Sequence, residues 1–148
     1  MTIRRFRGQY RFLSNFYLCR VEYEGRVYRS VEHAYQSAKA TNEADRKKVA
    51  NSLEPAHAKS IGGRIQLRKG WGKMKRKVML ACLRSKFQDK ELRNWLVETA
   101  PHDLVEGNFH GDDYWGVCPS AGDPNYMRGS NHLGRLLMKV RDEIMEAQ

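Results

Sequence analysis

The sequence lacks the features of membrane, exported and disulfide-stabilised proteins. No stretch approaches the ~18 consecutive apolar residues of a membrane helix, and no apolar run follows the first residues, so no signal peptide is expected. The three cysteines are widely spaced and form no CxxC pair, which indicates free thiols in a reducing compartment. We therefore expect a cytoplasmic protein that does not associate with membranes.

Common catalytic and cofactor signatures are also missing. The chain contains no GxSxG, GxxxxGK[ST] or GxGxxG pattern, which argues against a serine-hydrolase elbow, a P-loop and a dinucleotide fold. The five histidines show no spacing typical of metal ligands. We expect neither a metal ion nor a cofactor.

What the sequence has in excess is positive charge. The formal net charge is +10, and the segment 64–77 holds seven basic residues and no acid. Such a segment attracts nucleic acid or a phosphorylated small molecule, although a solvated helix face explains it equally well. Without a repeat or a linker, the 148 residues are expected to form one domain over 1–148.

The hydrophobic pattern predicts a mainly helical α+β fold with a small N-terminal antiparallel sheet. Apolar residues flanking Glu24 and Gly25 indicate a hairpin over 21–28. Glycine and proline crowd the segment 101–131, which we expect to be a long ordered loop. Helices are predicted at 31–41, 43–50, 55–62, 73–87, from 89 onward, and at 132–146.

Four polar residues share one face of the helix predicted after Ser30. They stand at i, i+3, i+4 and i+7 and are Glu32, Tyr35, Gln36 and Lys39. Such a row is unusual for a core face and ordinary for a surface face. The pattern alone favours a solvated row over a functional site.

A lysine interrupts an apolar stripe on the helix predicted at 73–87. The stripe consists of Trp71, Lys75, Val78 and Cys82, at i, i+4, i+7 and i+11. Burial would lower the pKa of the Lys75 amine and make it available as a nucleophile or base. The simpler interpretation, which this pattern favours, is that its stem packs and its ammonium reaches water.

Carboxylates adjoin large aromatic residues within the loop 101–131. Glu106 and Asp112 come shortly before Trp115, an arrangement suited to recognition of a sugar and a base. A local turn, with Asp112 accepting from backbone amides, explains the pattern equally well. After the loop, Gly129–Gly134 opens the last helix, where backbone amides can bind an anion, although N-capping by Ser130 or Asn131 is more common.

Eight blocks, taken in their order along the chain, resemble the NADAR (YbiA-like) family from about residue 12 to residue 144. The blocks are 12–16 (FLSNF), 30–39 (SVEHAYQSAK), 63–64 (GR), 67–71 (LRKGW) with Lys75 and Met79, 83–87 (LRSKF), 104–106 (LVE), 112–116 (DDYWG) and 131–134 (NHLG). Many relatives continue after Gly116 with an acid and glycines. Here the first acid is displaced to Asp123, which leaves the leaving-group preference open.

The resemblance implies a mainly helical fold with one polar pocket and an N-glycosidase activity. It implies hydrolysis of the ribose C1–N bond in ribosylamino-pyrimidine phosphates, early intermediates of riboflavin synthesis, so the expected partner is a phosphorylated ribose compound. A second family branch removes ADP-ribose from guanine in nucleic acid, and ADP-ribosylated nucleic acid is the alternative substrate. A third hypothesis is a non-catalytic module that binds nucleic acid or ADP-ribose.

Two mechanisms fit the matched residues. A carboxylate (Glu32, Glu106 or Asp112) activates water or shields the positive charge at C1, or a lysine (Lys75 or Lys39) attacks C1 and forms a Schiff base. Arg64 and the helix start at Asn131 are candidates for binding phosphate, and Phe16 and Trp115 for stacking on the base. The residues expected to bind substrate are Ser14, Asn15, Phe16, His33, Gln36, Arg64, Trp71, Trp115, Gly116, Asn131 and Gly134.

Overall fold

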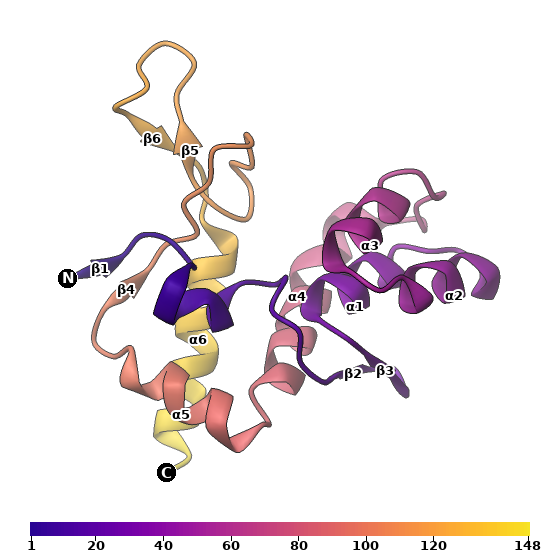
Figure 1. Cartoon of the computed structure of the whole chain (residues 1–148), viewed down its shortest axis with the longest axis horizontal. Helices are drawn as coiled ribbons and strands as arrows, with labels where there is room; N and C mark the ends of the chain where they lie inside the picture. Colours follow the sequence, from indigo (N-terminus) through magenta and orange to yellow (C-terminus); the bar gives the residue numbers. More distant parts are fainter. The chain divides into compact units, whose positions relative to one another are not determined.

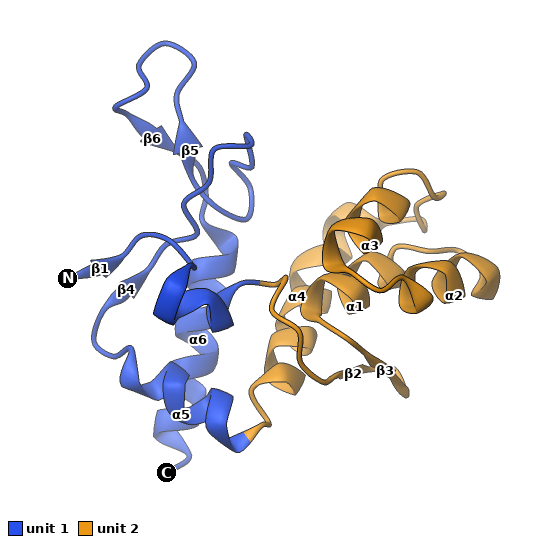
Figure 2. Cartoon of the chain, in the orientation of Figure 1, with its two compact units in different colours: residues 1–14, 90–148 blue, residues 15–89 orange.

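The computed structural model describes all 148 residues as a mainly helical chain with three two-stranded sheets (Figure 1). The chain divides into two compact units (Figure 2). Unit 1 comprises residues 1–14 and 90–148, and unit 2 comprises residues 15–89. The expected mainly helical α+β class is confirmed, whereas a single domain over 1–148 stays a prediction.

Unit 2 begins with the predicted hairpin. Strand β2 (Val21–Tyr23) pairs antiparallel with β3 (Arg26–Tyr28). The two turn residues, Glu24 and Gly25, both have positive φ, at 47° and 80°, as a tight hairpin turn requires. The sequence signal for this hairpin was therefore correct.

Four helices complete unit 2, and their starts follow local capping rules. They are α1 (Val31–Ala38), α2 (Glu43–Asn51), α3 (Pro55–Gly62) and α4 (Trp71–Lys86). The side chains of Ser30 and Asn42 accept hydrogen bonds from the first turns of α1 and α2, and Pro55 opens α3 where a missing N–H costs nothing. Helix α1 ends at Ala38, earlier than predicted, because Ala40 pairs in a β-bridge with Leu67.

Helix α1 is the centre of unit 2, since every one of its eight residues is buried. Helices α2, α3 and α4 all pack against it. The approach of α3 depends on Gly62, where a Cβ atom would lie 1.9 Å from Oε1 of Gln36. A larger residue at this position would displace the side chain of Gln36.

Unit 1 joins the two ends of the sequence. Strand β1 (Thr2–Ile3) pairs parallel with β4 (Asp103–Leu104), and the 3-10 helix η1 (Gly8–Leu13) follows β1. Helices α5 (Lys90–Glu98) and α6 (His132–Glu146) pack against each other. Between them the loop contains a second antiparallel pair, β5 (Cys118–Pro119) with β6 (Met127–Arg128), which the sequence did not predict.

None of these helices is both long enough and apolar enough to cross a bilayer.

Candidate active site

The polar row of α1 lies inside unit 2 rather than on its surface. Glu32 and Gln36 are 7% and 5% exposed, and Nε2 of Gln36 donates to Oε2 of Glu32 over 2.6 Å. The amine of Lys39, one turn further on, is half-buried and lies 5.4 Å from the ring centre of Tyr35. The solvated-row interpretation of this pattern is therefore wrong, because α3 and α4 cover the face.

Burial changes the chemistry of the Lys39 amine. Loss of hydration lowers its pKa, the charge of Glu32 opposes that effect, and the nearby charges of Lys75 and Lys59 lower the pKa further. A lowered pKa increases the fraction of neutral amine, which is the form able to attack carbon or accept a proton. Lys39, which the sequence offered as a candidate nucleophile, shows this property.

The apolar stripe of α4 is confirmed, but Lys75 is only partly enclosed by it. Trp71, Val78 and Cys82 are buried, while Lys75 is intermediate in exposure. The ring of Trp71 lies 5.3 Å from that of Tyr35, which links α4 to α1. This placement agrees with the simpler interpretation, in which the stem of Lys75 packs and its ammonium reaches water.

The ring of His33 is buried inside unit 2 and hydrogen-bonded through both nitrogens. Its Nε2 lies 2.9 Å from the carbonyl oxygen of Ser52, which can only accept, so Nε2 donates. Its Nδ1 lies 2.7 Å from Oγ of Ser30. Burial lowers the pKa of His33, which favours the neutral ring that this pattern needs. Both ring nitrogens are used inside the fold, so His33 positions α1 and has no nitrogen left for a substrate.

The segment before β2 contributes the polar side chain of Asn15. The carbonyl of Asn15 accepts from the backbone amide of Glu32 over 3.1 Å, and its Nδ2 lies 3.6 Å from Sδ of Met79. Its Oδ1 is buried and has no hydrogen-bond partner, which leaves an acceptor for a hydroxyl or amine close to α1. Phe16 is 41% exposed, and Ser14 follows η1 with intermediate exposure.

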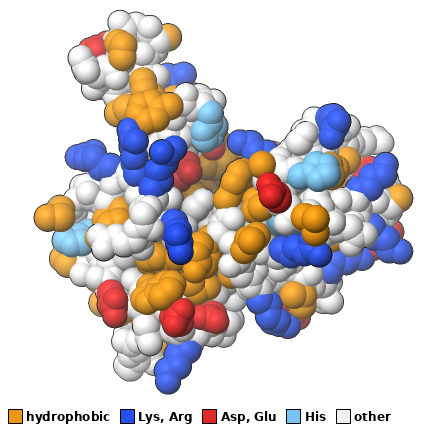
Figure 3. Space-filling model, viewed as in Figure 1, with side chains coloured by type: hydrophobic (Ala, Val, Ile, Leu, Met, Phe, Trp, Pro, Cys, Tyr) orange, Lys and Arg blue, Asp and Glu red, His pale blue; other side chains and the backbone are white.

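Arg64, the expected phosphate ligand, lies on the surface of unit 2. Its Nε donates to the carbonyl of Ser60 over 3.3 Å, and most of the basic residues between Arg64 and Lys77 are exposed. On the face shown in Figure 3, Lys and Arg side chains clearly outnumber acidic ones. The segment 64–77 is therefore available to an anionic partner.

A second polar cluster lies in unit 1, in the loop that precedes α6. Oδ1 of Asp112 accepts from the backbone amides of Tyr114 and Trp115 over 3.1 and 2.9 Å. This is the local turn that the sequence left as one of two interpretations. The indole of Trp115 lies edge-on to Tyr114, with ring centres 4.9 Å apart, and is half-buried.

Asn131 connects the two ends of this loop. Its Oδ1 accepts from the amide of Glu106 over 3.0 Å, and its Nδ2 donates to the carbonyl of Leu104 over 3.0 Å. Two glycines allow the close packing: a Cβ on Gly116 would lie 2.0 Å from the carbonyl oxygen of Glu106, and one on Gly134 would lie 2.1 Å from that of Leu104. Asn131 and both glycines therefore hold the backbone around Glu106.

Three backbone amides at the start of α6 bind carbonyl groups of the loop. The amides of Asn131, His132 and Leu133 donate to the carbonyls of residues 116, 114 and 115, so these donors are already used. Asn131 also makes no capping hydrogen bond and adopts a left-handed conformation, with φ of 51°. Side-chain capping by Asn131 is therefore wrong, while anion binding at this helix start stays a prediction.

Comparison with known proteins identifies the chain. The model of the NADAR domain matches residues 4–145. The chain belongs to the NADAR family. N-glycosidase YbiA of Escherichia coli is 36% identical over 134 residues, which are 88% of this chain and 79% of that protein. Riboflavin biosynthesis protein VVA0006 of Vibrio vulnificus is 35% identical over 138 residues, covering 91% of this chain and 36% of that protein.

The fold of this NADAR protein is also similar to a solved structure. The NMR structure of E. coli YbiA aligns with a TM-score of 0.82 at 34% identity, covering 99% of this chain and 86% of that one. The expected membership and helical fold class are thus confirmed. With relatives named N-glycosidases from E. coli and Nostoc punctiforme, this NADAR protein is a hydrolase of the N-glycosidase class.

Lys86, for which no role was expected, is the most deeply buried charged residue of this NADAR protein. Its side chain is 0% exposed, and its amine lies 5.7 Å and 5.3 Å from the ring centres of Tyr17 and Phe87. Burial lowers the pKa of Lys86 to about 8. Lys86 stands four residues after Cys82 and so continues the buried stripe of α4, a signal that was present in the sequence.

Proposed function

We propose that this NADAR protein hydrolyses the bond between ribose C1 and nitrogen in a ribosylamino-pyrimidine phosphate. The observation that carries the proposal is the amine of Lys39, with its lowered pKa, on the same buried helix face as Glu32. The names of two relatives, N-glycosidase YbiA and Riboflavin biosynthesis protein VVA0006, support the reaction and the class of substrate. A soluble metabolite of this kind also agrees with the proposed cytoplasmic location.

In the proposed mechanism, Lys39 acts as the nucleophile. Its neutral amine forms a bond to C1 while the bond from C1 to the leaving nitrogen breaks, and the proton lost by the amine goes to that nitrogen. Opening of the ribose ring then gives a Schiff base between C1 and Nζ. Water adds to C1, the C1–Nζ bond breaks, and ribose phosphate leaves with the amine restored. This series of reaction steps is redox-neutral and consumes only water.

Glu32 is proposed to carry the proton between these groups. Its carboxylate acts electrostatically on Lys39 and is oriented by Nε2 of Gln36. A carboxylate held by a neutral amide can accept a proton from the attacking amine and return it to the leaving nitrogen. Asn15, with its unpaired Oδ1, is proposed to accept from a ribose hydroxyl.

A carboxylate mechanism is the competing route, with Glu32, Glu106 or Asp112 activating water. Trapping with borohydride separates the two routes, because only a Schiff base is reduced to a stable secondary amine. With substrate and borohydride, we expect a covalent adduct on the peptide that contains Lys39, and none in Lys39→Met. Lys77→Met, which changes an exposed lysine of α4, serves as the control and should still form the adduct.

ADP-ribosylated nucleic acid is the second candidate substrate, favoured by the exposed basic residues of the segment 64–77. The two substrates are compared directly by measuring hydrolysis of a ribosylamino-pyrimidine phosphate and of an oligonucleotide that carries ADP-ribosyl guanine. Release of ribose phosphate from the first alone supports the proposal. Release of ADP-ribose from the second alone replaces it, and turnover of neither contradicts it and favours a binding module.

A further inference from the structure

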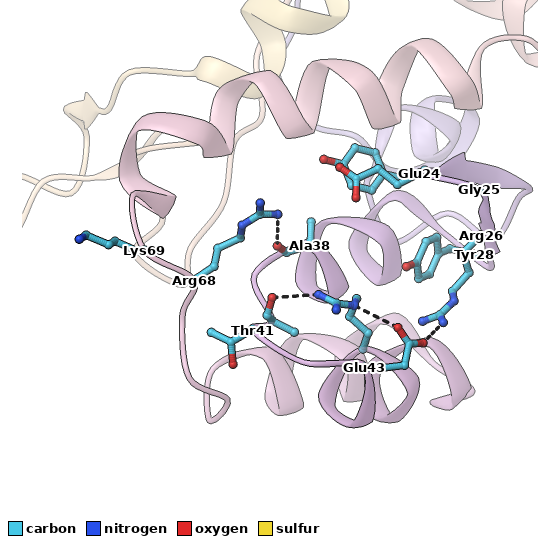
Figure 4. A pocket seen from close by; sticks show the side chains of 12 residues that line it. Glu24, Gly25, Arg26, Tyr28, Ala38, Thr41, Glu43, Arg68 and Lys69 are labelled. Atoms are coloured by element: carbon cyan, nitrogen blue, oxygen red, sulfur yellow. Dashed lines mark hydrogen bonds and ion pairs between the residues drawn. The ribbon is translucent and has the colours of Figure 1, made fainter.

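Unit 2 contains a polar cavity, and none of the residues expected to be catalytic or to bind substrate lines it. The cavity has a volume of about 560 Å³. The β2–β3 hairpin, the end of α1, the start of α2 and the segment before α4 surround it (Figure 4). Four basic and two acidic side chains line it, and they are Arg26, Arg46, Arg68, Lys69, Glu24 and Glu43.

The acidic side chains of this cavity are already occupied by partners from the protein. Glu43 forms ion pairs with Arg26 and, over 3.3 Å, with Arg46. The carboxylate of Glu24 accepts a hydrogen bond from Tyr23, and burial together with Glu24 raises the pKa of that phenol to about 12. The lining thus keeps an excess of positive charge.

The basic side chains have unused hydrogen-bonding capacity. Nη1 of Arg26 is buried and makes no hydrogen bond. Arg68 donates from Nη1 to the carbonyl of Ala38 over 3.4 Å and forms no ion pair, and Lys69 extends from the rim without one (Figure 4). Buried donors without acceptors are costly, so an anion that enters here gains hydrogen bonds the protein alone does not make.

We propose that this cavity is a second binding site and that it takes a phosphorylated small molecule. The planar guanidinium groups of Arg26 and Arg68 match the oxygen atoms of a phosphate, and Lys69 can reach it from the rim as a flexible point charge. The volume lies in the range that holds small ligands, so it accommodates more than inorganic phosphate. The half-buried ring of Tyr23 in the same lining offers an apolar surface to the rest of the ligand.

The cavity and the candidate catalytic lysine lie on the same stretch of backbone, but the side chain of that lysine does not line the cavity. Ala38 and Ala40 line the cavity, and Lys39 between them does not. The amide of Arg68 donates to the carbonyl of Lys39 over 2.8 Å. This bond fixes the backbone segment between the cavity and the side chain of Lys39. Because the side chain of Lys39 does not line the cavity, binding in the cavity is measured without turnover.

The test is calorimetric titration of the whole protein with pyrophosphate and with adenosine monophosphate at constant ionic strength. Saturable binding by the wild type is expected, weakened about tenfold or more in Arg68→Met, as loss of a charged hydrogen bond predicts. Arg76→Met is the matched control, since Arg76 belongs to the same basic segment, is exposed and does not line the cavity. Absence of saturable binding, or equal weakening by both variants, would overturn the proposal.

Two further variants separate this site from folding effects and from the candidate active site. Lys69→Met changes an exposed side chain and should weaken binding about threefold relative to Lys73→Met, even if Arg68→Met melts at a lower temperature. Lys39→Met should bind as the wild type does, and loss of binding in that variant would contradict a separate site. A single-stranded oligonucleotide distinguishes the phosphate source: binding of it alone, weakened equally by Arg68→Met and Arg76→Met, would assign the anion to the protein surface and overturn the proposal.

Discussion

Helix α1 and the loop before α6 are both rich in polar residues, but the two regions use them differently. On the face of α1 that carries Glu32 and Lys39, polar side chains bind other side chains, as Gln36 binds Glu32. In the loop, polar side chains bind backbone groups: Asp112 holds two amides, and Asn131 holds an amide and a carbonyl. A regular helix satisfies its own backbone, so its side chains are left for chemistry, whereas an irregular loop needs its side chains to satisfy the backbone.

This difference predicts which substitutions affect turnover and which affect folding. Changes on the polar face of α1 should reduce activity in a protein that still folds. Changes in the loop should lower the free energy of unfolding, with activity lost only as the fold is lost.

The largest effect is expected for Lys39→Met. Removal of a nucleophile costs on the order of a thousandfold or more in kcat, and the long apolar side chain keeps the packing against Tyr35. The measurement is kcat for the ribosylamino-pyrimidine phosphate, together with the thermal unfolding midpoint. An unchanged midpoint with kcat reduced by less than about tenfold would place the nucleophile elsewhere.

The next effect concerns Lys86, whose burial should make stability depend on pH. Its pKa rises from about 8 in the folded protein to its ordinary value of 10.5 on unfolding, so in this window the unfolded chain binds a proton that the folded chain does not. The free energy of unfolding therefore rises with pH from about 8 to 10.5. The difference between the two pKa values corresponds to about 3 kcal/mol.

Lys86→Met should remove this rise, because methionine does not titrate. Denaturant unfolding of the wild type, Lys86→Met and the exposed-lysine variant Lys77→Met at several values of pH measures it. Curves for wild type and Lys86→Met that run parallel between pH 8 and 10.5 would show that Lys86 is not buried with a lowered pKa.

A smaller loss of stability is expected from Gly134→Ala in α6, at the point where this helix packs against the loop. The added Cβ would lie 2.1 Å from the carbonyl oxygen of Leu104, and overpacking of this kind costs about 1–3 kcal/mol. Gly122→Ala is the matched control, since no atom lies within 4 Å of its Cβ position. Chemical denaturation measures both, and equal stability of the two variants would mean that α6 can shift away from the loop.

The features predicted correctly from the sequence are those decided within a few neighbouring residues. The start of α1 after Ser30, the turn at Glu24 and Gly25, and the start of α3 at Pro55 all follow from local backbone chemistry. The boundaries of the last helix, 132–146, were also correct because its apolar spacing is regular.

The features that could not be predicted depend on groups distant in the sequence. Glu32 and Gln36 are buried because α3 and α4 pack against α1, and nothing within the α1 sequence distinguishes this row from a solvated one. The role of Asn131 requires the backbone of residues 104 and 106, about 25 positions earlier. Lys86 is the exception, because its spacing from Cys82 is visible in the sequence.

The smallest effect expected is a pair of opposite shifts in the pH dependence of activity, caused by substitutions at Glu32 and Lys75. The charge of Glu32 raises the pKa of Lys39, and that of Lys75 lowers it, against the larger effect of burial. Glu32→Gln removes the first influence, so the pKa of Lys39 falls and the rising limb of the pH–rate profile moves to lower pH. Lys75→Met removes the second, so the pKa rises and the limb moves to higher pH.

These two shifts are tested by measuring the residual kcat/KM of both variants from pH 5 to 10. The pH dependence of kcat/KM reports the pKa values of groups in the free enzyme. Lys73→Met, which changes an exposed lysine of α4 that does not act on Lys39, should leave the limb in place. Movement of the limb in the same direction in both variants would mean that a group other than Lys39 titrates. Opposite movements would link the measured activity to the amine on α1, because no residue of the loop before α6 acts on the pKa of Lys39.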